Sequence, residues 1–299
     1  MTQLLPTWAP VVTPFGPDLA PDTKRFLAHC RWLLANNVGL AIFGTNSEAN
    51  SMSVAEKIEL LNCLSEADLP RDCLMPGTGG CAIPDTVALT RHAIESGMHN
   101  VLILPPFYYK GVSEEGLYGY FSEVIERVGS DALRIFLYHI PPVSQVPLSV
   151  SLIEKLLKAY PDNIAGIKDS SGDWRNTQAV LEAFAGTDFR VYAGSERFLL
   201  PTLRAGGAGC ISATANVNPK AISRLAENWR NNDADERQAE LNRIRDILES
   251  VPVIPALKEI IAHYGNDIGW KTLRPPLVNL TEAQRGSLME ALKTARFSM

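Results

Sequence analysis

A short apolar run, a polar or glycine-containing turn and an amphipathic stretch of helical length recur along this chain about every thirty residues. This pattern is typical of strands that alternate with helices, and such strands pair in parallel through right-handed crossovers. Eight such units close naturally into a barrel. The sequence therefore predicts an α/β fold, a (β/α)₈ TIM barrel, with strands at residues 9–13, 39–43, 73–76, 100–104, 134–138, 164–168, 190–193 and 209–213.

The stretches between the predicted strands carry helix signals. In 54–67 the apolar residues lie largely on one helical face, and 84–96 shows the same pattern. Ser53 and Glu56 have the spacing of a capping box, and Ser113 precedes two glutamates at a second predicted helix start.

Residues 219–299 contain helix patterns only, at 219–229, 234–248, 253–264 and 281–296, and no low-complexity linker precedes them. We expect a barrel over residues 1–218 and a C-terminal helical extension over 219–299 that packs on it as one structural unit. A doubly wound open sheet is the main alternative. It would place a glycine-rich nucleotide turn after the first strand, and residues 12–16 (Val-Thr-Pro-Phe-Gly) do not have that form.

The composition is that of an ordinary globular protein. Hydrophobic residues make up 46% of the 299 residues, and the formal net charge of -5 disfavours nucleic acid as a partner. No apolar stretch approaches the length of a membrane span, and the N-terminal residues lack the pattern of a signal sequence, so we expect a cytoplasmic protein. The five cysteines are scattered and odd in number, which fits free thiols in a reducing compartment.

Lys168 stands at the end of the predicted strand 164–168, where a parallel sheet buried on both faces normally has apolar residues. Lysine is among the residues least often fully buried unless it is paired or has a task. If its side chain points into the barrel, burial favours the neutral amine, which is a nucleophile. The alternative is that the lysine stem lies along the sheet while its ammonium group reaches solvent.

The residues that follow the other strands bear on this choice, because the active site of such a barrel lies at the carboxyl ends of its strands. Tyr138 ends one predicted strand, Thr45 lies in the turn 44–47 after another, and Tyr109 follows a third. A lysine, a tyrosine and a hydroxyl-bearing turn on one face indicate carbonyl activation. A neutral lysine amine forms an imine with a keto group, and the protonated imine draws electrons from the adjacent carbon–carbon bond.

Within this chemistry, the hydroxyls of Tyr138, Thr45 and Tyr109 could form a proton shuttle, and backbone N–H groups of the turn could bind a carboxylate. Structural explanations remain open for the same residues. Tyr138 could be a core aromatic whose hydroxyl has found a partner, and Thr45 could be a cap or turn residue. Their neighbours His139 and Asp169 are expected to point away from the site, toward the helical layer.

Two other patterns bear on the chemistry. The run 206–209 (Gly-Gly-Ala-Gly) suggests phosphate binding, but a tight turn into the last strand is the better explanation. The five histidines form no His-Glu-x-x-His motif and no cluster at zinc-ligand spacing, which disfavours a metal-dependent aldolase. An imine-forming lysine requires neither metal nor cofactor, and we expect none.

Five ordered motifs resemble the dihydrodipicolinate synthase and N-acetylneuraminate lyase superfamily, the pyruvate-type class I aldolases built on a (β/α)₈ barrel. The resemblance covers essentially the whole chain. The motifs are Gly-Thr-Asn-Ser-Glu at 44–48, Tyr-Tyr at 108–109 followed by Ser-Glu-Glu-Gly-Leu-Tyr at 113–118, Tyr-His-Ile-Pro at 138–141, Gly-Ile-Lys-Asp at 166–169 and Gly-Gly-Ala-Gly-Cys-Ile-Ser at 206–212.

The resemblance implies roles for residues at the matching positions. Lys168 would form the Schiff base, Tyr138 would act as general acid and base, and Thr45 would relay protons. The backbone of Thr45 and Asn46 would bind the carboxylate of the 2-oxo acid, and Ile211 would line the site.

Tyr109 matches a tyrosine that, in this family, reaches across a dimer interface into the neighbouring site, and the usual assembly is a homotetramer of two such dimers. Two positions depart from the pattern. Ser47 stands where the family usually has glycine, and Val143 stands where true dihydrodipicolinate synthases carry an arginine for the second substrate. The run 168–173, with Ser170 as a further substrate-binding candidate, looks closer to hydroxy-oxo-acid and keto-deoxy-sugar-acid aldolases or dehydratases.

Arg197 is a candidate contact for a distal carboxylate or hydroxyl of the substrate, with a surface salt bridge as the alternative. We therefore expect a Schiff-base lyase that reversibly cleaves a 4-hydroxy-2-oxo acid to pyruvate and an aldehyde. The same-fold alternatives are dihydrodipicolinate synthase, which condenses pyruvate with aspartate semialdehyde, and a 2-keto-3-deoxy-sugar-acid dehydratase. A non-enzymatic alternative is a barrel that binds a 2-oxo acid as a sensor.

Overall fold

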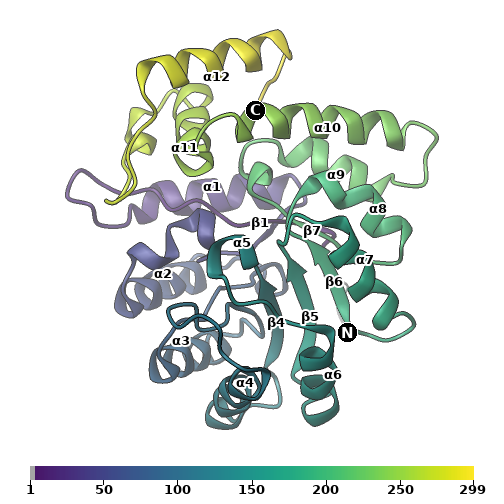
Figure 1. Cartoon of the computed structure of the whole chain (residues 1–299). Coiled ribbons are helices and arrows are strands. Elements are labelled where there is room, and N and C mark those ends of the chain that lie inside the picture. The colour runs from purple at the N-terminus through teal and green to yellow at the C-terminus, as the bar shows by residue number, and fades with distance from the viewer. Residues whose placement is uncertain (1–3) are drawn as a thin grey trace.

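The computed structural model describes residues 4–299 (Figure 1). Strands within this part of the chain form one parallel sheet in the order β2-β1-β7-β6-β5-β4-β3. The strands are β1 (Thr7–Ala9), β2 (Gly39–Leu40), β3 (Asn100–Ile103), β4 (Arg134–His139), β5 (Ile164–Asp169), β6 (Arg190–Ala193) and β7 (Gly209–Ile211). The parallel pairing is the one that alternating strands and helices predict.

The remaining predicted strand, 73–76, completes the ring without becoming a regular strand. Leu74 forms an isolated parallel bridge with β2, and Gly77 forms one with β3. The backbone hydrogen bonds that join residues 75–78 to these two strands are 2.7–3.0 Å long. Pro76 has no N–H to donate toward β3, which interrupts the ladder on that side. The segment nevertheless lies between the two edge strands and closes the barrel.

The first strand begins and ends earlier than predicted. The prediction placed it at 9–13, whereas β1 spans Thr7–Ala9. Pro10 follows directly and cannot donate to a neighbouring strand. The N–H of Val12 donates instead to the side-chain oxygen of Asn216, at 3.0 Å. The predicted range was therefore wrong, and residues 10–13 leave the ladder as a buried loop.

Helices cover the outside of the barrel (Figure 1). They are α1 (Thr23–Ala35), α2 (Val54–Glu66), α3 (Ile83–Glu95), α4 (Glu114–Val128), the short α5 (Pro141–Ser144), α6 (Val150–Ala159), α7 (Trp174–Ala183) and α8 (Leu199–Arg204). Both predicted helix starts are confirmed, because the hydroxyls of Ser53 and Ser113 accept hydrogen bonds from backbone N–H groups in the first turns of α2 and α4. The run 206–209 is the turn from α8 into β7, as predicted.

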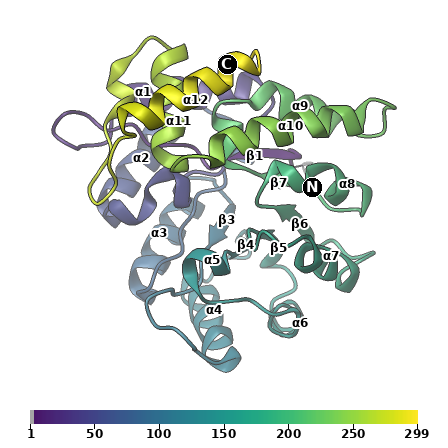
Figure 2. The ribbon, with the colours of Figure 1, turned by 45° about the horizontal axis from the view of Figure 1, so that its top comes forward.

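The C-terminal extension consists of α9 (Pro219–Glu227), α10 (Ala234–Glu249), α11 (Val253–Tyr264) and α12 (Glu282–Thr294). These helices lie together over one side of the barrel (Figure 1, Figure 2). Buried residues of both parts form one apolar cluster, with Val12 and Val217 from the barrel side and Leu257 and Ile260 from α11. Among residues 4–299, no helix is both long and apolar enough to cross a membrane.

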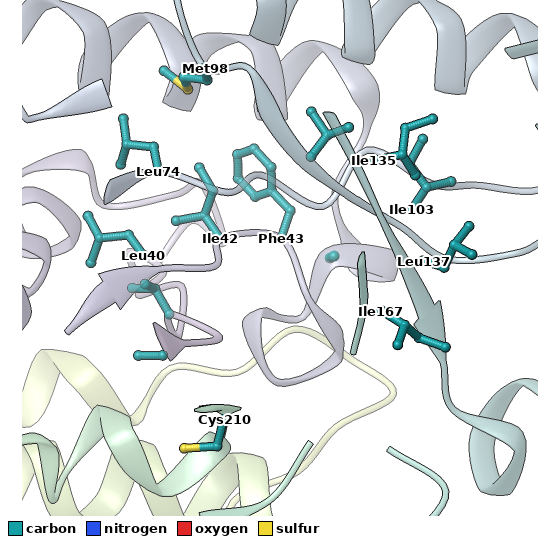
Figure 3. Close-up of a cluster of buried hydrophobic side chains, with 14 of the residues drawn as sticks. Leu40, Ile42, Phe43, Leu74, Met98, Ile103, Ile135, Leu137, Ile167 and Cys210 are labelled. Carbon is teal, nitrogen blue, oxygen red and sulfur yellow. The ribbon is translucent and has the colours of Figure 1, made fainter. Parts of the chain in front are cut away.

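Two layers of apolar side chains make up the barrel core. The outer layer lies between the strands and the helices and includes Leu137 and Ile167 (Figure 3). The inner layer fills the barrel and contains Trp8, Ala41, Met75, Leu102, Phe136, Tyr138, Ile140, Tyr192 and Ile211. Successive side chains of a strand point to opposite faces. Because Leu137 and Ile167 belong to the outer layer, their neighbours Tyr138 and Lys168 point into the barrel.

Candidate active site

Lys168 is buried inside the barrel at the end of β5, with 2% of its surface exposed. β4 and β5 pair so that Tyr138 lies directly beside Lys168. The lysine Nζ lies 4.1 Å from the centroid of the Tyr138 ring. Within the described chain, no carboxylate forms an ion pair with this amine. A solvent-reaching lysine would be exposed, so the buried side chain contradicts the alternative of an ammonium group in water.

Thr45 and Tyr138 meet at the same end of the barrel. The Thr45 hydroxyl lies 3.2 Å from the Tyr138 hydroxyl, within hydrogen-bond distance. Thr45 begins a short 3₁₀ helix, η1 (Thr45–Ser47), in the turn that follows β2. The structure thus brings together Lys168, Tyr138 and Thr45, which come from three separate parts of the sequence. A hydroxyl pair beside a buried amine is the arrangement that proton transfer to and from an imine requires.

The turn that carries Thr45 is held in shape by hydrogen bonds within and beside it. The Ser47 hydroxyl accepts from the N–H of Gly44 at 3.1 Å, and the Ser47 carbonyl accepts from the Thr13 hydroxyl at 2.8 Å. Ser47, which stands where the family usually has glycine, is fully buried here. Its side chain therefore braces the turn from inside. Asn46 is half-buried beside it.

Glu48 closes this turn and ties it to the extension. Its backbone is left-handed, with φ 55°. Its carboxylate is buried and forms an ion pair with Lys258 of α11. The Lys258 ammonium also donates to the carbonyl of Thr272 at 2.8 Å, and the N–H of Arg274 donates to the second carboxylate oxygen at 3.1 Å. Burial lowers the pKa of Lys258, while the Glu48 carboxylate opposes that shift.

Sequence reasoning missed this contact. Lys258 stands within a helix whose residues from Pro255 to Ala262 are all buried. A lysine in such an apolar run is the signal that singled out Lys168. The same signal was present at Lys258, but the prediction for the extension was only that it packs on the barrel, so Lys258 was assigned no role.

His139 and Asp169 face the helical layer, as strand alternation predicts. The Nδ1 atom of His139 accepts from the N–H of Leu148 at 3.0 Å, and burial lowers the pKa of the histidine. The carboxylate of Asp169 accepts from the hydroxyl of Thr177 at 2.6 Å and from the amide of Asn176 at 3.0 Å, both in α7. Asp169 thus anchors the end of β5 to the following helix, which fixes the position of Lys168.

Arg197 does not present a free guanidinium to a substrate. Its Nη2 atom lies 2.6 Å from the carboxylate of Asp246 and 3.1 Å from that of Glu249, both in α10. The structure therefore shows the surface salt bridge that was the alternative, and the contact with a substrate stays a prediction. The partners lie about fifty positions away in the sequence, and no local pattern indicates them.

The remaining predicted site residues differ in their surroundings. Ile211 is fully buried in the inner layer together with Tyr138. Ser170 lies just beyond Lys168 against Gly194, where an added Cβ would come within 2.0 Å of the Ser170 hydroxyl. Tyr109 is 72% exposed and stacks edge-on against Tyr108, also exposed. Among residues 4–299, the hydroxyl pair of Thr45 and Tyr138 forms no hydrogen bond with Tyr109.

A further buried carboxylate, to which sequence reasoning assigned no role, lies at the strand ends. Glu196 follows β6, and its Oε2 atom contacts the hydroxyl of Ser212 and the guanidinium of Arg245, the latter at 3.3 Å. Arg245 belongs to α10 and also donates to the Thr214 hydroxyl at 3.3 Å.

In residues 4–299, no three His, Cys, Asp or Glu side chains gather in a way that could hold a metal ion.

Known proteins are similar to this chain over nearly its whole length. The model of the dihydrodipicolinate synthetase family matches residues 4–295. A protein named uncharacterized DapA-like lyase, from Chloroflexus aurantiacus, is 34% identical over 284 residues, which cover 94% of this chain and 93% of that protein.

Solved structures of other proteins have a similar fold over nearly the whole chain. The dihydrodipicolinate synthase of Agrobacterium tumefaciens superimposes with a TM-score of 0.90 at 30% identity, over 97% of this chain and 99% of the other. YagE of E. coli K12, described as a prophage protein of the dihydrodipicolinic acid synthase family in complex with pyruvate, has a TM-score of 0.88 at 26% identity, over 97% and 98% of the two chains.

Proposed function

This chain belongs to the dihydrodipicolinate synthetase family, and from that membership we propose that it is a Schiff-base lyase that reversibly cleaves a 4-hydroxy-2-oxo acid to pyruvate and an aldehyde. The observation that carries the proposal is the buried Lys168 amine beside the Tyr138 ring, with the Thr45 hydroxyl next to that of Tyr138. These groups suffice for imine formation and proton transfer.

The proposed reaction begins when the neutral amine of Lys168 attacks the 2-oxo carbon. Tyr138 donates a proton to the oxygen that leaves as water, which gives the protonated imine. Tyr138 then accepts the proton of the substrate's 4-hydroxyl group as the bond between carbons 3 and 4 breaks. The electron pair of that bond moves into the imine and forms an enamine, while the aldehyde leaves. Protonation at carbon 3 and hydrolysis release pyruvate and restore the amine.

Thr45 and the turn around it have two tasks in this proposal. The Thr45 hydroxyl exchanges protons with Tyr138 over the 3.2 Å contact. The backbone N–H groups of Thr45 and Asn46 bind the carboxylate of the 2-oxo acid, because successive N–H groups in a tight turn form an anion-binding concavity. The braced turn keeps those donors in place, with Ser170 and Ile211 beside the bound acid.

Val143 bears on the choice among family reactions. It lies in α5 with 61% of its surface exposed, and a valine cannot bind the carboxylate of aspartate semialdehyde. This favours cleavage of a hydroxy-oxo acid over the synthase reaction. A 2-keto-3-deoxy-sugar-acid dehydratase would share the imine and lose water without releasing pyruvate.

We also propose that the active assembly is a homotetramer of two dimers, in which Tyr109 of one subunit completes the hydroxyl relay of another. The exposure of Tyr108 and Tyr109, at 74% and 72%, supports an interface at this surface, because large aromatic side chains are enriched in buried contacts between subunits. Light scattering after size-exclusion chromatography measures the assembly. A monomer with full activity would contradict the proposed role of Tyr109.

Trapping of the imine tests the central proposal. Borohydride reduction in the presence of pyruvate should add one reduced pyruvyl group to Lys168, measured by intact mass and peptide mapping. The Lys168→Arg variant is the negative control, and a protein with no adduct would refute the imine mechanism. A panel of 4-hydroxy-2-oxo acids assayed for pyruvate release then separates the lyase from the synthase, which consumes aspartate semialdehyde, and from the dehydratase. Imine formation without turnover of any acid would favour a sensor.

A further inference from the structure

A hollow of about 370 Å³ lies on the extension, between α9, α10 and residues 295–298 at the end of α12. None of its lining residues belongs to the candidate active site. The C-terminus lies beside α10 in the view of Figure 1, and residues of both line the hollow. The hollow is thus formed by segments that are distant in sequence, and its volume lies within the range of small-molecule sites.

Positive charge dominates the lining of this hollow. Its basic residues are Lys220 and Arg224 of α9, Arg237 and Arg243 of α10, and Arg296 of the C-terminal segment. Glu240 is the acidic residue that lines it. We call this site the basic hollow. Such a concentration of like charge is notable in a chain whose net charge is -5, because the mutual repulsion of these groups opposes folding unless an anion offsets it.

Internal ion pairs account for little of this charge. Arg237 binds Asp233 through Nη2, but its Nε atom is buried without a hydrogen-bond partner in the described chain. Asp233 also lies close enough to Arg224 for the arginine's charge to lower the pKa of the carboxyl group, although the Arg237 hydrogen bond contributes more. Lys220, Arg243 and Arg296 form no ion pair with any carboxylate of residues 4–299. Donors are therefore available to a ligand.

The floor of the basic hollow is apolar. Leu241 and Ile244 of α10 are buried beneath it, and Phe297 packs on the apolar cluster of the extension. A left-handed turn at Arg296, with φ 52°, reverses the chain after α12. The N–H of Phe297 then donates to the carbonyl of Leu292 at 2.9 Å, which holds the C-terminal segment against the helices. The basic rim and the apolar floor thus belong to one folded surface.

We propose that the basic hollow binds a phosphorylated small molecule of about mononucleotide size. A phosphate monoester carries up to two negative charges and several acceptor oxygens, and guanidinium groups bind it through paired N–H donors. The organic part of the ligand packs on Leu241, Ile244 and Phe297. A volume of about 370 Å³ matches the size of a small molecule, and the acidic net charge of the chain disfavours nucleic acid.

Isothermal titration calorimetry on the full-length protein tests this proposal with three anions and one neutral control. The ligands are AMP, glucose 6-phosphate, inorganic pyrophosphate and adenosine, all at the same ionic strength. We expect AMP or glucose 6-phosphate to bind, and adenosine to bind at least about tenfold more weakly than AMP, because each charge-assisted contact contributes about that factor. Comparison of the two phosphate esters distinguishes a nucleotide from a sugar phosphate.

The variant R224Q/R243Q removes two guanidinium groups from the rim, and K24Q/K293Q is the matched control, since it removes two exposed positive charges that do not line the hollow. We expect affinity to fall about a hundredfold in the first and to stay within about twofold in the second. Pyruvate trapping on Lys168 should persist in both, so the outcome is independent of the proposed catalytic function. Absence of binding by all three anions, binding of pyrophosphate alone, or equal affinity of wild type and R224Q/R243Q would each overturn the proposal.

Discussion

Replacement of Lys258 by methionine should destabilise the protein and weaken its binding of 2-oxo acids. The Lys258 ammonium is 1% exposed, bonded to the Glu48 carboxylate and 4.5 Å from the centroid of the Phe15 ring. Methionine keeps most of the side-chain volume but leaves Glu48 as a buried carboxylate that retains the N–H of Arg274. Removal of one partner from a buried ion pair costs about 3–5 kcal/mol. We expect the free energy of unfolding to fall by that amount.

The turn at Thr45 should change as well. Glu48 adopts a left-handed backbone conformation that costs a residue other than glycine about 1–2 kcal/mol. The ion pair with Lys258 holds it there. When the pair is lost, the turn is free to relax, and we expect the KM for the 2-oxo acid to rise about tenfold, the equivalent of one hydrogen bond to a charged group.

Urea unfolding followed by tryptophan fluorescence, at fixed protein concentration, measures the loss of stability. The double variant E48Q/K258M is the matched control, because it removes both charges and leaves neither one buried alone. It should lose less stability than either single variant. A K258M protein within about 1 kcal/mol of wild type would refute the reasoning, as would a double variant whose loss equals the sum of the two single losses.

Three further predictions concern other parts of the chain. Tyr138→Phe removes the hydroxyl that contacts Thr45 and should lower kcat by about 10²–10⁴-fold. The control Tyr264→Phe removes an exposed hydroxyl and should leave kcat unchanged. An unchanged kcat in Tyr138→Phe would exclude Tyr138 as the general acid and base. Gly194→Ala places a Cβ 2.0 Å from the Ser170 hydroxyl and should cost about 1–3 kcal/mol of stability in urea unfolding, while Gly119→Ala in α4, where nothing lies within 4 Å, should cost none. Burial lowers the pKa of His29 from 6.5 to about 4, although its contact with Asn216 opposes the shift. Because the unfolded chain takes up this proton first as pH falls, stability should be complete above pH 6.5 and should decline by about 3 kcal/mol between pH 6.5 and 4. The decline should be absent in His29→Gln, and an equal decline in that variant would assign it to other groups.

Local patterns predict the fold and part of the candidate site. Alternating strands and helices predict the parallel barrel, and strand alternation predicts that Asp169 and His139 point to the face opposite Lys168 and Tyr138. The stretch around Lys168 left open whether its side chain points inward, and the tyrosine and threonine at the other strand ends favoured that orientation. The first strand was misplaced because Pro10 ends the ladder there. An apolar run alone does not show which of its residues pair with a neighbouring strand, since buried loops are apolar too.

Contacts between distant segments were beyond the reach of those patterns. Arg274 and Glu48 are separated by 226 positions, and Arg197 and Asp246 by 49. The periodicity of apolar residues and the local composition describe residues that are close along the chain. An ion pair between distant segments depends on where two elements meet in space. Arg197 shows the consequence, because a charged residue on a strand-end loop is compatible with both a substrate contact and a salt bridge until its partner is known.

Two cations of the extension reach carboxylates at the strand ends of the barrel. Lys258 from α11 binds Glu48 beyond β2, and Arg245 from α10 binds Glu196 beyond β6 and Ser212 beyond β7. A carboxylate buried at a strand end is unfavourable unless a cation offsets it. The barrel supplies those carboxylates, and α10 and α11 supply the cations. We therefore infer that α10 and α11 stabilise the turns at these strand ends.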